Sequence, residues 1–229
     1  MFVKICGITN EDDALLATAL DADALGFVFA PSPRRVHADD VRDIVKRLPR
    51  EIHTVGVFRN ERRERVVELV SRTGLHGAQL HGNESDADVE WIHERVRFVI
   101  RAYAAGDPAL ANARNSAADV ILVDSPDPGS GKVFDWRLAE GAPRGVRLLI
   151  AGGLTPANVG DAIRLVRPWG VDVSSGVEDK PGRKDPTKLR EFIEAARDTA
   201  AILDDRTIDL TDEDDVAGIT RPWDWEIDE

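Results

Sequence analysis

Short apolar runs alternate with amphipathic segments along this chain. Eight runs are rich in β-branched or large apolar residues and have the length of strands. They cover residues 2–6, 24–29, 54–58, 77–80, 98–102, 120–123, 148–151 and 171–173. Between them the apolar spacing becomes helical, which predicts helices after Asn10 and over residues 41–48, 61–72, 86–96, 108–118, 136–140, 156–166 and 186–203. Eight strands alternating with eight helices predict a (β/α)8 TIM barrel in the α/β class.

Helix-start signals support this alternation. Asn10 is a suitable N-cap, and Asp12 and Asp13 suit the positive end of the first helix. Pro156 and Pro186 stand where a proline in the first helical turn is favoured. The competing fold, an open doubly wound sheet, would have a Gly-x-Gly-x-x-Gly turn after an early strand, and none follows residues 2–6. The closed barrel is therefore the prediction.

Length and charge define the domain. The 229 residues suit one barrel, which we expect over residues 1–203, followed by an acidic C-terminal extension over residues 204–229. That extension has eleven acidic residues and two arginines and no helical or strand period, so we expect it to be loosely ordered. The net charge of −12 argues against nucleic-acid binding.

Several protein classes are excluded by what the sequence lacks. It has no apolar run long enough to cross a membrane, no signal-peptide pattern, and one cysteine, which cannot form an internal disulfide. The histidines are scattered without metal-ligand spacing. We therefore expect a cytoplasmic protein with no membrane or metal partner.

In a TIM barrel the chemistry lies at the C-terminal ends of the strands. One thiol, one carboxylate, one imidazole, an arginine pair and two glycine turns stand at those ends: Cys6, Asp124, His81, Arg34 with Arg35, Gly152 with Gly153, and Ser175 with Gly176. Core packing does not explain such a convergence, so these residues are the candidate site.

The two glycine turns lie after the seventh and eighth predicted strands, where barrels commonly bind phosphate. Backbone N–H groups at Gly152, Gly153 and Gly176 can approach an anion. Either turn alone is better interpreted as an ordinary left-handed glycine turn that binds no ligand. Their position together predicts a phosphorylated small-molecule ligand.

Cys6 and Asp124 are the candidates for proton transfer. Cys6 is either a reactive thiol or a small buried hydrophobe. Asp124 ends an apolar strand, so its carboxyl should be partly desolvated, which suits a proton donor; the alternative is a turn-forming aspartate. Lys4 shares the inward face with Cys6, where it either supports the thiolate or, the interpretation we favour, pairs with an aspartate.

Arg35 and His81 are the candidates for positioning a ligand. Arg35 follows a stiff proline loop and can bind a carboxylate or phosphate, whereas Arg34 is interpreted as a surface residue. His81 is either a polar positioning group or a structural histidine.

These motifs together resemble the phosphoribosylanthranilate isomerase family of tryptophan biosynthesis. The likeness runs in order from about residue 2 to 203 through KICGIT (4–9), GFVF (26–29), SPRR (32–35), VGVF (55–58), QLHG (79–82), FDW (134–136), AGGL (151–154) and DVSSGVE (172–178). Each motif is modest, but their combination is specific.

The resemblance implies an aldose–ketose isomerase, an intramolecular oxidoreductase that performs an Amadori rearrangement of N-(5-phosphoribosyl)anthranilate without cofactor or metal. It implies Cys6 as general base, Asp124 as general acid, and Arg35 as the residue that binds the anthranilate carboxylate. The glycine turns, with Ser175, match the phosphate cradle. Asp172 and His81 match supporting polar positions, and the chain is expected to be a monomer or homodimer.

One segment departs from the family pattern. The usual glycine-rich turn after the acid is here DPGSGK (127–132), with Pro128 in place of the first glycine, so Gly129 and Gly131 are weaker candidates. Two alternatives remain: another phosphosugar isomerase barrel, such as the histidine-pathway enzyme type with its aspartate base, or a non-catalytic sensor of a phosphorylated ligand. Cys6 counts against the first, and Cys6 with Asp124 against the second.

Overall fold

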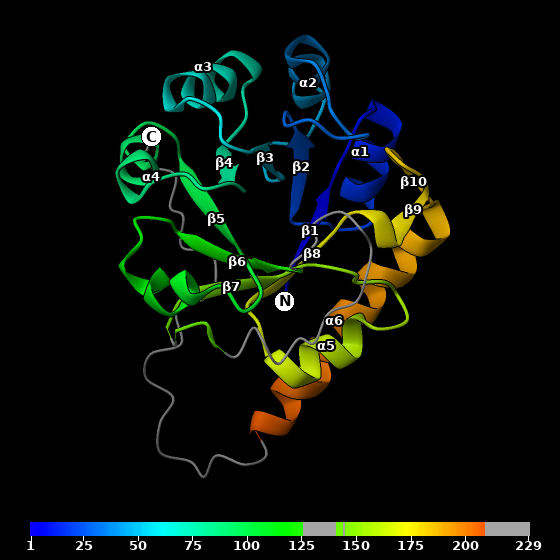
Figure 1. The fold of residues 1–229 in the computed structure, drawn as a ribbon. Helices are drawn as coiled ribbons and strands as arrows, with labels where there is room; N and C mark the ends of the chain where they lie inside the picture. The colour runs from blue at the N-terminus through cyan, green and yellow to red at the C-terminus, as the bar shows by residue number, and fades with distance from the viewer. Residues whose placement is uncertain (126–140, 144, 209–229) are drawn as a thin grey trace.

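Eight parallel strands close into a barrel in which neighbours in the chain are neighbours in the sheet (Figure 1). The computed structural model describes residues 1–125, 141–143 and 145–208. The strands are β1 (Phe2–Cys6), β2 (Ala24–Val28), β3 (His53–Phe58), β4 (Gly77–Leu80), β5 (Phe98–Ala104), β6 (Val120–Asp124), β7 (Arg147–Ile150) and β8 (Gly170–Val173). Each lies within two residues of its predicted range, and the TIM-barrel prediction is confirmed.

Helical segments follow the strands and cover the outside of the barrel (Figure 1). They are α1 (Glu11–Ala19), α2 (Ala38–Val45), α3 (Arg63–Thr73), α4 (Asp86–His93), the 3-10 helix η1 (Pro108–Asn115), α5 (Val159–Val166) and α6 (Pro186–Ile208). The Asn10 cap is confirmed, since its Oδ1 accepts from Asp13 N at 2.9 Å. Pro186 begins α6, as expected.

Several predicted helices differ from the structure: α2 begins and ends three residues earlier than expected, and α4 ends three residues earlier. Residues 108–118 were expected to be α-helical, but η1 is a 3-10 helix that buries only Leu110 and Ala113, too small an apolar face to stabilise several α-turns. α5 begins at Val159 rather than at residue 156, because Asn158 Oδ1 accepts from Thr155 N and so fixes a turn ahead of the helix.

Part of the prediction falls outside the described residues. This applies to the helix over 136–140, the motif over 134–136, and the loop with Pro128, Gly129 and Gly131. Helix α6 continues to Ile208, five residues past the expected domain boundary at 203. The rest of the acidic extension lies outside the described part of the chain.

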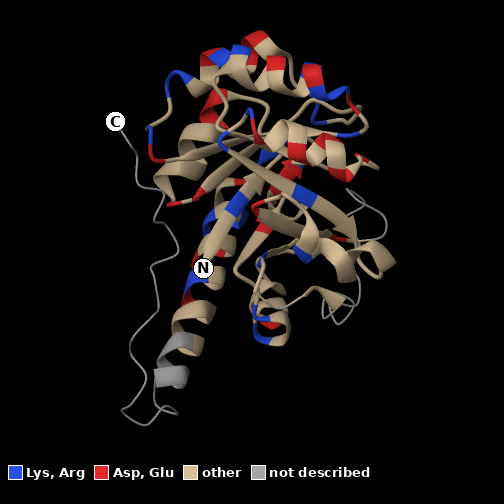
Figure 2. Cartoon of the chain, turned by 90° about the vertical axis from the view of Figure 1, so that its left-hand side faces the viewer, with Lys and Arg blue, Asp and Glu red and all other residues tan. Residues whose placement is uncertain are grey.

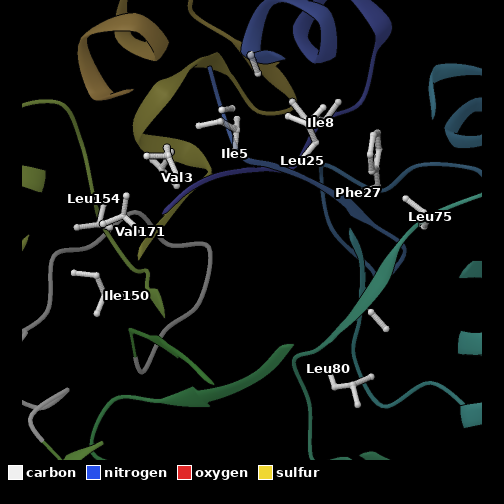
Figure 3. Packing of buried hydrophobic residues seen from close by; sticks show 14 of the residues in the cluster. Val3, Ile5, Ile8, Leu25, Phe27, Leu75, Leu80, Ile150, Leu154 and Val171 are labelled. Atoms are coloured by element: carbon white, nitrogen blue, oxygen red, sulfur yellow. The ribbon is translucent and has the colours of Figure 1, made fainter. Parts of the chain in front are cut away.

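The buried side chains form two layers separated by the strands. Outward-facing residues such as Val3 and Ile5 pack with Leu25, Phe27 and Val171 between the barrel and the helices, as Figure 3 shows. Inward-facing residues fill the barrel: Phe2, Ala24, Val55, Ile100, Ala102, Val120, Leu122, Leu149 and Ala151. Because side chains alternate along a strand, Phe2, Lys4 and Cys6 of β1 face the interior of the barrel.

Charged residues of both signs are interspersed on the outer helices of the face in Figure 2 rather than gathered into a basic patch. This agrees with the body of the chain, where 31 acidic residues up to position 203 face 28 basic ones. Among the described residues, no helix combines the length and apolar character needed to span a bilayer.

We expect the layer between barrel and helices to dominate stability. Leu25 is fully buried and Leu165 on α5 is 47% exposed. Leu25→Ala should lower the free energy of unfolding by about 2–5 kcal/mol because it leaves a cavity, whereas Leu165→Ala should change it by less than about 0.5 kcal/mol. Urea unfolding followed by circular dichroism measures both, and equal midpoints would contradict this account of the core.

Candidate active site

One pocket opens at the C-terminal ends of the strands. It is lined by Cys6, Arg34, Gln79, His81, Asp124, Gly152, Gly153, Asp172, Ser175 and Gly176, together with apolar residues such as Val57 and Leu154. Eight of the nine predicted site residues therefore come together at this mouth, from strands far apart in the chain. Arg35 is the exception.

Cys6 is the last residue of β1 and is 7% exposed. Burial raises the pKa of its thiol above the ordinary value, and the charge of Asp172 adds to that increase. The Lys4 and Lys184 ammonium groups act in the opposite direction and lower the pKa of the thiol, Lys4 more strongly. The site thus holds a buried thiol with two cations close enough to stabilise its charged form.

Lys4 lies one step deeper on the same face of β1. Its Nζ lies 2.8 Å from Asp172 Oδ1 on β8, and its side chain is completely buried. Burial by itself lowers the pKa of Lys4, but the charges of Asp172 and Cys6 outweigh this and leave the pKa above its ordinary value. The predicted lysine–aspartate pair inside the barrel is therefore confirmed.

Asp124 ends β6 and is held on both carboxylate oxygens. Oδ1 accepts from Ser125 N at 2.7 Å, and Oδ2 lies 3.3 Å from His81 Nε2. The other ring nitrogen of His81 accepts from Gln79 Nε2 at 3.1 Å, which assigns the remaining ring proton to Nε2, facing Asp124. His81 therefore orients the carboxyl group within the pocket.

Gln79 supplies a polar atom without a protein partner. Its Oε1 is buried and makes no hydrogen bond to any described residue, although the side chain lines the pocket. A buried acceptor normally has a partner, so this oxygen is available to a hydroxyl or amine of a bound ligand.

The glycine turns have the geometry of a cradle for an anion. Gly152 and Gly153 have φ of 86° and 67°, a left-handed conformation that favours glycine. A methyl group on Gly176 would lie 1.8 Å from Leu154 O, so only glycine allows the loops after β7 and β8 to touch. Both turns line the pocket, side by side, as the phosphate-site prediction requires.

Arg35, the predicted carboxylate-binding residue, does not line this pocket, whereas its neighbour Arg34 does, so the role of Arg35 stays a prediction. Arg35 is exposed and its backbone bridges Val28, whereas Arg34 lines the pocket. The two arginines lie in and directly after a turn in which Arg35 N donates to Ser32 O, and only the Arg34 side chain lies against the pocket. The interpretation of Arg34 as a surface residue is wrong, since its side chain is 11% exposed.

Glu178 fixes Arg34 and was missed by the sequence reasoning. Its two carboxylate oxygens accept from Arg34 Nε at 2.8 Å and Nη2 at 2.7 Å. Burial alone raises the pKa of Glu178, but the hydrogen bonds and charges of Arg34 and Lys184 outweigh it and bring the pKa below its ordinary value. The Arg34 guanidinium is thus held in one orientation at the wall of the pocket.

Lys184 links this ion pair to the thiol strand. Its buried Nζ donates to Cys6 O at 2.7 Å, Ser174 O at 3.1 Å and Glu178 Oε1 at 3.2 Å. Glu178 and Lys184 belong to a short hairpin, β9 (Glu178–Lys180) and β10 (Arg183–Lys184), whose charged sequence is typical of surface turns. Only the fold shows that two of its charges are buried.

The described residues form no metal site. No group of three or more His, Cys, Asp or Glu within the described ranges is placed to hold a metal ion. A second hollow, lined by Arg50, His53, His76, Arg97 and Arg197, lies at the N-terminal ends of the strands. It contains none of the predicted site residues, and in a barrel that end serves stability rather than chemistry.

Comparison with known proteins agrees with the site. Residues 3–195 match the family model described as N-(5'phosphoribosyl)anthranilate (PRA) isomerase. The chain is 46% identical over 203 residues to the N-(5'-phosphoribosyl)anthranilate isomerase of Desulforudis audaxviator, covering 86% of this chain and 98% of that protein.

Solved structures give the same answer. The phosphoribosyl anthranilate isomerase of Thermus thermophilus superposes with a TM-score of 0.82 at 39% identity, covering 86% of this chain and 99% of that one. A second isomerase structure, in complex with reduced 1-(o-carboxyphenylamino)-1-deoxyribulose 5-phosphate, superposes with a TM-score of 0.77 at 40% identity, with the same coverage. A barrel with a thiol, a carboxyl group and two glycine turns at its mouth, matched along nearly the full length of these enzymes, belongs to the phosphoribosylanthranilate isomerase family of tryptophan biosynthesis.

Proposed function

We propose that this pocket converts N-(5'-phosphoribosyl)anthranilate into 1-(2-carboxyphenylamino)-1-deoxyribulose 5-phosphate, with Cys6 as general base and Asp124 as general acid. The observation that carries the proposal is the presence of these two groups in one pocket, on strands that are three positions apart around the barrel. An acid and a base so separated can reach different atoms of one bound sugar.

The first step opens the sugar ring. Asp124 in its protonated form donates its proton to the furanose oxygen, the bond between C1 and that oxygen breaks, and the anthranilate nitrogen lone pair forms a C1=N iminium. His81 Nε2, 3.3 Å from Asp124 Oδ2, keeps the carboxyl group in place and stabilises the carboxylate that remains.

The second step moves the hydrogen from C2. The Cys6 thiolate takes the C2 proton, the C–H electron pair becomes the C1=C2 double bond, and the iminium electrons return to nitrogen. The resulting enolamine tautomerises to the ketone. No electrons leave the substrate, so the balance requires neither an oxidant nor a cofactor.

The remaining residues hold the two ends of the substrate. The turns at Gly152, Gly153 and Gly176, with Ser175, form the phosphate cradle. Arg34 binds the anthranilate carboxylate, because it lines the pocket and its hydrogen bonds to Glu178 use only Nε and Nη2. Asp172 forms an ion pair with Lys4 inside the barrel.

The bound product analogue in a similar isomerase supports this assignment, since that ligand carries both a carboxylate and a phosphate. We place the reaction in the cytoplasm. A monomer and a homodimer are the two assembly states to be distinguished; the isomerase of Thermotoga maritima is described as dimeric.

We expect Cys6→Ala and Asp124→Ala each to lower kcat by about 10²- to 10⁴-fold, because each removes one proton-transfer group. Loss of anthranilate-type fluorescence, followed without added metal, measures turnover. Retained turnover in either folded variant would overturn that residue's role. No turnover by the folded wild type would instead favour a ligand sensor.

The pH dependence follows from the buried thiol. Because burial raises the pKa of Cys6, the reactive thiolate is a minor species at neutral pH and increases as the pH rises. We expect kcat/KM to increase by up to about tenfold per pH unit on the alkaline side of neutrality, until the thiol is ionised. A pH profile of kcat/KM that is flat across this range would exclude Cys6 as the base in the rate-limiting step.

The neighbouring arginines make a matched pair for substrate binding. Arg34→Ala should lower kcat/KM by about 10- to 100-fold through a higher KM, since it removes a charge-assisted hydrogen bond worth about 1.5–3 kcal/mol. Arg35→Ala should stay within about twofold of the wild type, because its side chain points to solvent. Steady-state kinetics of both variants test the assignment, and the reverse order would restore Arg35.

A further inference from the structure

Within the described part of the barrel, the Lys4 ammonium group is paired with a carboxylate and lies near the Cys6 thiol. Lys4 is completely buried, its Nζ lies 2.8 Å from Asp172 Oδ1, and both its Nζ and the Cys6 sulfur lie against Gly26. A buried cation requires one compensating anion, and Asp172 already supplies it. The position of the ammonium beside the thiol is therefore not required for charge neutralisation.

The backbone fixes this arrangement. Lys4 and Cys6 are two residues apart on β1 and both face inward, and the register sets Lys4 opposite Asp172 on β8 and Cys6 opposite Gly26 on β2. The three functional groups therefore come from paired positions of the sheet and not from a loop.

Gly26 provides the space in which the two groups meet. A methyl group added at Gly26 would lie 2.8 Å from Cys6 Sγ and 3.1 Å from Lys4 Nζ. The sulfur and the ammonium thus occupy the volume that a side chain at Gly26 would fill. Any residue other than glycine would push them out of it.

Lys4 opposes the effect of burial on the thiol while keeping its own proton. The pKa of Lys4 is raised by Asp172 and Cys6 beyond the effect of burial, so the lysine keeps its proton. Burial raises the pKa of Cys6, and Lys4 provides the largest opposing effect. In a site of low dielectric, such a neighbouring cation acts strongly on the sulfur.

We propose that Lys4 is a positioning residue for the proton-abstracting thiolate: its ammonium, anchored by Asp172, holds the Cys6 sulfur as a hydrogen-bond acceptor and stabilises its negative charge. This rests on the proposed role of Cys6 as the base. When the thiolate takes the C2 proton of the substrate it becomes a neutral thiol, while Lys4 and Asp172 stay paired. No proton leaves Lys4 during the reaction.

The single cysteine makes a direct test possible. The ultraviolet absorbance of the thiolate, titrated with pH in the ligand-free protein and corrected with a Cys6→Ser variant, reports the ionisation of Cys6 alone. Lys4→Met would leave Asp172 unpaired in the barrel, so the informative variant is the doubly neutral Lys4→Met/Asp172→Asn. It removes the cation without leaving a buried charge.

The matched control is Asp172→Asn alone, because the two charges act on the sulfur in opposite directions. We expect the double variant to lower the thiolate fraction at a fixed alkaline pH by about tenfold, corresponding to one pKa unit. Asp172→Asn alone should raise that fraction. If Lys4 had a purely structural role, the pKa of Cys6 would not rise in the double variant and would not fall in Asp172→Asn.

The pH profile of kcat/KM gives the second measurement. Its alkaline rise should shift to higher pH in the double variant by the same amount as the thiol titration. An unchanged thiol titration in a double variant with wild-type circular dichroism would overturn the inference, whatever the activity. A shifted titration together with full turnover by Cys6→Ala would instead leave the Lys4–Cys6 coupling intact and refute Cys6 as the base.

Discussion

The buried charge of Lys4 is the constraint on which the site depends. An ammonium group inside a barrel is stable only beside an anion, and here that anion is Asp172, 168 positions later in the chain. Because these residues lie on β1 and β8, their pairing stabilises the closure of the barrel between its first and last strands. The same β1–β8 pairing places the thiol of β1 in one pocket with the glycine turn after β8.

A second buried network surrounds the first. Arg34 from the loop after β2, Glu178 and Lys184 from the hairpin after β8, and the carbonyl of Cys6 form a continuous chain of hydrogen bonds. Each charged member is matched by a partner, which limits the cost of burying it. The result joins the residue proposed to bind the substrate carboxylate to the strand that carries the proposed base. Specific binding and proton transfer are therefore supported by one rigid group of side chains.

Much of this could be predicted from the chain itself. The alternation of strand and helix patterns identifies every strand to within two residues, and the rule that chemistry lies at strand ends selects Cys6, His81, Asp124 and both glycine turns. The failures are equally instructive. Two adjacent arginines look alike in a sequence, and only the direction of the backbone after β2 decides that Arg34 faces the pocket. Glu178 and Lys184 look like surface charges in the sequence, because no pattern in the neighbouring residues shows that a charged side chain is buried.

The sequence by itself determined the barrel, the order of its elements, the family and most of the residues at the mouth, because periodicity and short motifs are local properties of the chain. The tertiary structure decided which charges pair: Lys4 with Asp172, Arg34 with Glu178, His81 with Asp124. These pairs join residues that are between about 40 and 170 positions apart, and their energies depend on burial and distance, which arise only when the sheet closes.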